Sequence, residues 1–141
     1  MIKIYLAIAL FWICLLPPLF TDGRCTAEFD RAFTQVQANQ GALARSGQAR
    51  DFLRSHEWHA SVISHDQCRT SRPRTVTRCA PGAIVLGEMP IENLICRIYR
   101  DDAVRVQLEY GDDDFLERTV VDMSPFKSLP LPFGKTLDWA R

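Results

Sequence analysis

The segment 103–110 constrains the fold of this chain more than any other part of its sequence. Apolar and polar residues alternate along it in the order Val104, Arg105, Val106, Gln107, Leu108, Glu109 and Tyr110. Successive side chains of a β-strand point to opposite faces, so this alternation predicts a strand with one buried face and one solvated face. Such a strand belongs to an antiparallel sheet, and the rest of the chain must supply its neighbours.

The segments on either side are predicted to be strands as well. Residues 94–100 are connected to this strand by Asp101 and Asp102, and a two-residue connection is typical of a β-hairpin. Residues 111–114 are rich in aspartate and predict the next turn, after which 115–123 forms a third strand.

Two shorter strands are predicted upstream, at 75–79, where β-branched residues alternate, and at 83–87. With the strands downstream they form an antiparallel meander over 75–123, or a small, partly open barrel. The whole region 74–141 is therefore predicted to be β-rich.

Residues 24–66 are predicted to be helical. Between 26 and 38, apolar residues recur at the spacing of one helical face: Phe29, Phe33 and Val36. A second helix is expected from Ala42 or Gln48 to Trp58, and the short link between the two predicts an antiparallel helix hairpin. The predicted fold class is α+β, with the helix hairpin followed by the β-meander.

The N-terminus carries the features of an export signal. An unbroken apolar run at 4–16 has the length of a signal-peptide core, and Pro17 and Pro18 are expected to break it. We interpret 1–23 as a signal peptide and 24–141 as a single small globular domain. An uncleaved segment would instead anchor the protein in a membrane.

Four cysteines follow the signal segment, and an even number in an exported chain predicts disulfides: Cys25, Cys68, Cys79 and Cys96. The helix hairpin favours Cys25–Cys68 with Cys79–Cys96. The main competing bridge, Cys68–Cys79, would close an arginine-rich loop on itself. The spacings contain no C-x-x-C pair, so we predict no metal site and no cofactor.

Charge is unevenly spread along a chain whose net charge is zero. Residues 24–78 carry nine arginines against five acidic residues, whereas 79–141 carry seven basic residues against eleven acidic ones. A neutral total argues against a dedicated nucleic-acid binder. The apolar tail, which includes Phe126 and Phe133, is either an arm that closes the sheet, with an edge strand at 135–139, or a docking surface for a partner.

Two groups of side chains are candidates for a functional site. The first comprises all the histidines of the chain and one carboxylate, namely His56, Glu57, His59 and His65. Imidazole and carboxylate together can perform general acid–base chemistry. The second comprises four guanidinium groups between two cysteines, namely Arg69, Arg72, Arg74 and Arg78. Arginine binds carboxylates and phosphates bidentately, so this loop is a candidate docking site for an acidic partner, unless it is a solvated loop that pairs with acidic residues of its own domain.

These features favour a small exported protein of the bacterial envelope that binds another envelope or secreted protein without catalysing a reaction. A periplasmic inhibitor, an immunity protein and an accessory subunit all fit this description. The bacterial assignment rests on the short signal segment and on fourteen arginines against three lysines. The alternative is a small secreted hydrolase, nuclease-like, in which the histidine group is catalytic and the arginine loop holds phosphate.

Overall fold

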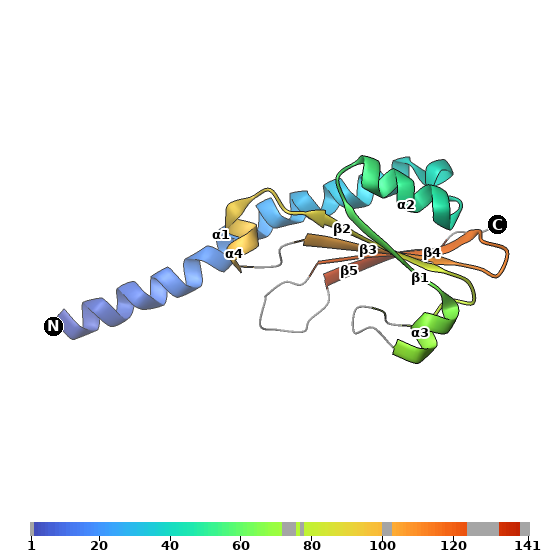
Figure 1. The fold of residues 1–141 in the computed structure, drawn as a ribbon. Coiled ribbons are helices and arrows are strands. Elements are labelled where there is room, and N and C mark those ends of the chain that lie inside the picture. The colour runs from blue at the N-terminus through green and yellow to red at the C-terminus, as the bar shows by residue number, and fades with distance from the viewer. Residues whose placement is uncertain (1, 72–75, 77, 100–102, 124–132, 139–141) are drawn as a thin grey trace.

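The computed structural model of the chain describes residues 2–71, 76, 78–99, 103–123 and 133–138 (Figure 1). Its helices are α1 (Ile2–Ala38), the 3-10 turn η1 (Gln40–Leu43), α2 (Ser46–Ser55), α3 (His65–Ser71) and α4 (Leu94–Tyr99). Its strands are β1 (His59–Ile63), β2 (Ile84–Pro90), β3 (Ala103–Tyr110), β4 (Leu116–Met123) and β5 (Phe133–Asp138). The α+β class predicted from the sequence is confirmed.

The strands form one antiparallel sheet in the order β1-β2-β3-β4-β5, so each strand pairs with its neighbour in the chain. An antiparallel meander was predicted, and β2, β3 and β4 lie where strands were expected, but β1 lies outside the predicted range 75–123. The sheet is open, with β1 and β5 at its edges. The backbone of β5 pairs with β4 from Arg118 opposite Asp138 to Met123 opposite Phe133, and the tail therefore extends the sheet as an edge strand.

Three segments differ from their predicted structure. Residues Leu94–Tyr99 form helix α4, not a strand, and the Asn93 side-chain oxygen accepts the backbone N–H of Cys96 at 3.4 Å, as a helix N-cap does. Strand β1 lies inside the region predicted to be helical and becomes the neighbour of β2. Of the strand predicted at 75–79, the described residues Val76, Arg78 and Cys79 are not in strand conformation. The expected turn at 101–102 lies outside the described residues.

Helix α1 runs without interruption through Pro17 and Pro18, so the predicted break is wrong. Proline removes one helical hydrogen bond, but its fixed φ of about −65° is itself helical, and the chain can keep its course. The N-terminal half of α1 extends away from the sheet (Figure 1) and exposes apolar side chains, namely Ile4, Tyr5, Leu6, Ile8 and Leu10. Within the described part of the chain, no helix has both the length and the apolarity needed to cross a membrane.

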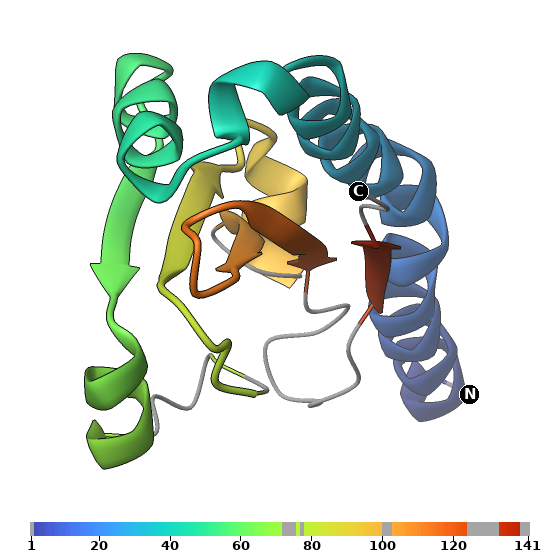
Figure 2. The ribbon, with the colours of Figure 1, turned by 90° about the vertical axis from the view of Figure 1, so that its right-hand side faces the viewer.

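The main core lies between one face of the sheet and the two long helices. The C-terminal half of α1 packs on β3 and β4, while α2 packs on β1 and β2, so the sheet holds both helices (Figures 1 and 2). Phe29 and Val36 of α1 and Leu53 of α2 are fully buried in this core. Tyr110 closes one end of it, where its hydroxyl donates a hydrogen bond to the Leu43 carbonyl at 2.8 Å.

Both disulfides expected from the four cysteines form, but the favoured pairing is wrong. Cys25 is bonded to Cys96 and Cys68 to Cys79, with Cα–Cα distances of 5.6 and 5.7 Å. Strand β1 carries the chain from the end of α2 to the opposite end of the sheet, and this takes Cys68 away from Cys25 (Figure 2). Helix α4 packs against α1 and brings Cys96 to it instead.

The second face of the sheet is also partly covered, which the alternation along β3 did not predict. Gln107 and Glu109 were expected in water, yet their exposed fractions are 6% and 1%. A smaller apolar cluster lies on this face, built from Cys68 of α3, Ala80 and Ile84. The disulfide-bonded segment that contains α3 therefore covers one end of the face predicted to be wet.

Candidate functional site

The three histidines do not form a cluster in the structure. His56 follows the end of α2, His59 begins β1, and His65 begins α3 beyond the other end of β1. The Nδ1 atom of His65 lies 2.6 Å from the carbonyl oxygen of Ala80, so this ring ties α3 to the segment before β2. His59 points away from the main core, since the next residue, Ala60, packs against it. Only His56 and Glu57 of the predicted catalytic group lie together.

His56 and Glu57 terminate α2 in a Schellman motif. The N–H of Glu57 donates to the Arg54 carbonyl at 3.1 Å, and the N–H of Trp58 donates to the Leu53 carbonyl at 3.0 Å. Glu57 has a φ of 63°, the left-handed conformation that this motif requires at its turning residue and that glycine normally supplies. Trp58 is then directed into the core, where it lies with Leu53 over Gly87.

A cleft of about 200 Å³, here called the corner cleft, opens beside this turn. Three elements that are far apart in the sequence line it: α1, the turn after α2, and the end of β2 with the residues that follow. Its lining residues are Arg31, Gln35, His56, Glu57, Trp58, Met89, Pro90 and Glu92. Apart from His56 and Glu57, none of these residues was a candidate from the sequence, because no local pattern connects α1 with the end of β2.

The predicted arginine group is divided between two roles. Arg69 lies on α3 and is exposed. Arg78 donates from Nε to Glu109 Oε2 at 2.8 Å, and Gln107 donates to the other carboxylate oxygen of Glu109 at 2.8 Å. Arg78 therefore neutralises a buried carboxylate of its own domain. Arg72 and Arg74 lie outside the described residues.

The Cys68–Cys79 disulfide encloses this arginine-bearing segment, with a sequence separation of 11 residues. Three interactions attach its two ends to the domain: the contact between His65 and Ala80, the ion pair between Arg78 and Glu109, and the apolar cluster around Ile84. We call residues 68–79 the arginine loop. Its ends are held in place by covalent, ionic and apolar contacts together.

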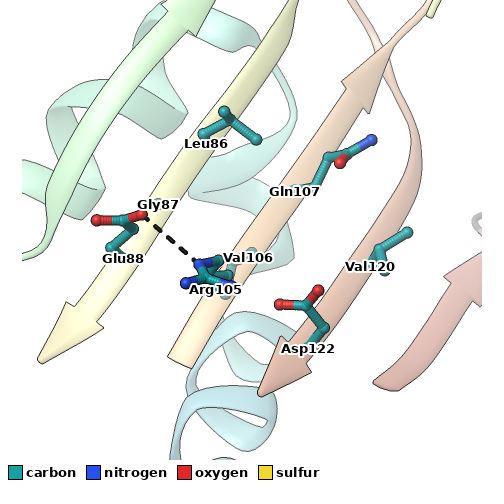
Figure 3. Close-up of a pocket in the computed structure, with 8 residues that line it drawn as sticks. All are labelled: Leu86, Gly87, Glu88, Arg105, Val106, Gln107, Val120 and Asp122. Atoms are coloured by element: carbon teal, nitrogen blue, oxygen red, sulfur yellow. Dashed lines mark ion pairs between the residues drawn. The ribbon is translucent and has the colours of Figure 1, made fainter. Parts of the chain in front are cut away.

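A shallow groove of about 40 Å³ crosses the second face of the sheet next to the covered end (Figure 3). One cross-strand row presents Leu86, Gln107 and Val120, and the next row presents Glu88, Arg105 and Asp122 (Figure 3). The charges in the second row alternate in sign, and Arg105 lies 3.8 Å from Glu88. Opposite charges on adjacent strands stabilise a sheet, so this row has a sufficient structural role.

Of the two tail residues predicted to contact a partner, Phe126 lies outside the described residues. Phe133 is the first residue of β5, and its backbone pairs with Met123. Among the side chains that the structure describes, no three histidine, cysteine, aspartate or glutamate residues are arranged as metal ligands.

Comparison of the chain with protein-family models, with curated protein sequences and with solved structures finds no match.

Proposed function

We propose that this protein is exported to the bacterial envelope and binds an acidic surface of another envelope or secreted protein without catalysing a reaction. A periplasmic inhibitor, an immunity protein or an accessory subunit would act in this way. The observation that carries the proposal is the Cys68–Cys79 disulfide, because it closes the arginine loop on itself.

Closure matters because recognition loses affinity when a loop must be ordered on binding. A disulfide reduces the number of conformations that the loop can adopt before it meets its partner. Arg78 is already paired with Glu109, so we assign partner binding to Arg69, Arg72 and Arg74. Guanidinium groups bind carboxylates bidentately and are frequent in protein interfaces.

Two further observations support export. Disulfides persist in oxidising compartments such as the periplasm, and both pairs of cysteines are bonded. The apolar run at 4–16 has the length of a signal-peptide core. The hydrolase alternative has less support, since β1 separates His59 from His65 and the latter is engaged with the Ala80 carbonyl.

The test is capture of the partner from the envelope and secreted fractions, with a loop variant and a matched control. Arg72→Glu with Arg74→Glu reverses two charges in the arginine loop. Arg50→Glu with Arg97→Glu reverses the same number on α2 and α4, where the Arg50 side chain is 41% exposed beside Asp51 and Arg97 is exposed. We expect the wild type and the control to retain one stoichiometric protein, and the loop variant to lose it at an unchanged melting temperature.

Retention of that protein by the loop variant would show that the arginine loop is not the binding site. Hydrolysis of RNA, DNA or peptidoglycan by the purified protein, abolished by His56→Ala, would replace the proposal with the enzymatic alternative.

A further inference from the structure

We infer that the corner cleft is a second binding site, separate from the arginine loop, and that it takes a single cationic group of the alkylguanidinium or alkylammonium class. The two sites lie at opposite ends of β2, because the cleft includes Met89 and Pro90 while the arginine loop packs near Ile84. The cleft volume of about 200 Å³ is several times the share of one water molecule in the liquid, which is about 30 Å³. It therefore has room for the end of a side chain.

Negative charge exceeds positive charge around the cleft. Arg31 is shared between two carboxylates, at 2.9 Å from Glu28 and 3.5 Å from Glu92. The Glu57 carboxylate has no hydrogen-bond or ion-pair partner within the described part of the chain. The cleft itself is lined by two carboxylates, Glu57 and Glu92, and by one guanidinium group, and a second cation there would pair with Glu57.

His56 adds a hydrogen-bond acceptor to the same wall. Its Nδ1 atom lies 2.9 Å from the Phe52 carbonyl oxygen, and a carbonyl oxygen can only accept. Nδ1 also lies 3.1 Å from the Ser55 Oγ atom, and in the tautomer that donates from Nδ1 to Phe52 the Nε2 lone pair can accept a hydrogen bond. Contact with the Phe52 ring, at 4.2 Å between centroids, holds the imidazole in place. A guanidinium or ammonium group carries only donors, so it matches this acceptor and the Glu57 carboxylate together.

The backbone at Glu57 adopts the left-handed conformation. A φ of 63° is unfavourable for any residue with a Cβ atom, and the Schellman motif would form more readily with glycine. The neighbouring wall is apolar, since Trp58 and Met89 are buried and Pro90 follows them. An arginine or lysine side chain combines an apolar stem with a charged end, and so fits a cleft with both kinds of wall.

The test is an NMR titration of the oxidised full chain with two probes of equal shape. N-acetyl-arginine amide carries the guanidinium charge, and N-acetyl-citrulline amide replaces it with a neutral urea group. The indole N–H of Trp58, assigned with Trp58→Phe, and the His56 ring report binding. We expect saturable shifts with the arginine probe and about tenfold weaker binding of the citrulline probe.

Two variants and a control locate the charge that matters. Glu57→Gln is expected to weaken binding of the arginine probe about tenfold, and Asp112→Asn, which removes an exposed carboxylate elsewhere, less than twofold. Glu57→Gly should also lose the affinity while raising the melting temperature by about 4 °C, so the loss cannot come from misfolding. Equal affinity for the two probes, no saturable shift, or undiminished binding by Glu57→Gln would overturn the inference.

The same titration distinguishes the source of the cation. Butylguanidinium, a free alkylguanidinium with a single charge, is compared with an arginine at the centre of a five-residue peptide. Tighter binding of butylguanidinium identifies a small-molecule ligand, and tighter binding of the peptide identifies a side chain of a protein. Arg72→Glu with Arg74→Glu leaves the cleft intact. Partner capture therefore tests the arginine loop and the titration tests the cleft, and either proposal can be refuted without the other.

Discussion

The Cys25–Cys96 bridge should contribute more stability than the Cys68–Cys79 bridge, and removing each pair separately tests the connectivity. Cross-linking lowers the entropy of the unfolded chain by an amount that grows with the logarithm of the loop length. With a separation of 71 residues, Cys25–Cys96 is worth about 4.4 kcal/mol at 25 °C. With a separation of 11 residues, Cys68–Cys79 is worth about 2.8 kcal/mol.

The perturbations are Cys25→Ala with Cys96→Ala, and Cys68→Ala with Cys79→Ala. Both sulfur atoms of the first pair lie in the main core, where their side chains are fully buried, so truncation adds a packing loss to the entropic one. Because small domains are stable by only about 5–15 kcal/mol, the first variant loses a large part of its stability. We expect its melting temperature to fall by about 15 °C or more, at roughly 4 °C for each kcal/mol.

The assay is urea unfolding followed by circular dichroism, with the free energy in water taken from the linear extrapolation. Peptide mapping under non-reducing conditions assigns the bonds in the wild type. A larger loss of stability in the Cys68/Cys79 variant would refute the loop-length argument. A mapped Cys25–Cys68 bond would refute the arrangement of α1 and α4 on which the argument depends.

The remaining predictions concern Tyr110 and two glycines. Tyr110→Phe should lower the free energy of unfolding by about 1–2 kcal/mol in urea unfolding, since it leaves the buried Leu43 carbonyl without its donor. Burial, with a smaller effect of the Asp114 carboxylate, raises the pKa of Tyr110 above its ordinary value of 10.0. As the pH rises, Tyr110 therefore ionises in the unfolded state before it ionises in the folded state. Its contribution to the free energy of unfolding should be constant below about pH 10 and decrease above that pH, and Tyr110→Phe should reduce this decrease. Gly82→Ala should destabilise the folded protein by about 1–3 kcal/mol, because the new Cβ would lie 2.1 Å from the Gly111 carbonyl oxygen. Gly47→Ala in α2 should stabilise it slightly, because a Cβ there would have no atom within 4 Å.

An unchanged pH profile in the Tyr110 variant would mean that another group governs the alkaline loss of stability. Tolerance of alanine at position 82, measured by the same unfolding experiment, would contradict the close approach of this residue to the end of β3.

Local patterns predicted most of the sheet. The alternation in β3 and the aspartate-rich turn after it depend on side chains within a few residues of one another, and both were predicted at the correct positions. The edge strand in the tail followed from its prolines, which exclude a central strand before Gly134. The apolar face of α1 between 26 and 38 followed from helical periodicity.

Short segments without a decisive period were mispredicted. The sequence of α4 is apolar enough for either a strand or a helix, and the Asn93 cap and packing against α1 select the helix. β1 follows α2 almost directly, and only the left-handed turn at Glu57 separates them. A glutamate at that position gives no signal of a helix end, because glycine is the residue that normally marks one.

The sequence by itself determined the α+β class, three adjacent strands of the sheet and the presence of disulfides, since these follow from periodicity and from the number of cysteines. Tertiary structure decided which cysteines meet, which polar residues of β3 are buried, and that His56 and Glu57 share a cleft with Arg31 and Glu92 while His59 and His65 lie elsewhere. The physical reason is the same in each case: these contacts join segments far apart in the chain, and their positions depend on the direction in which β1 and α4 carry the backbone.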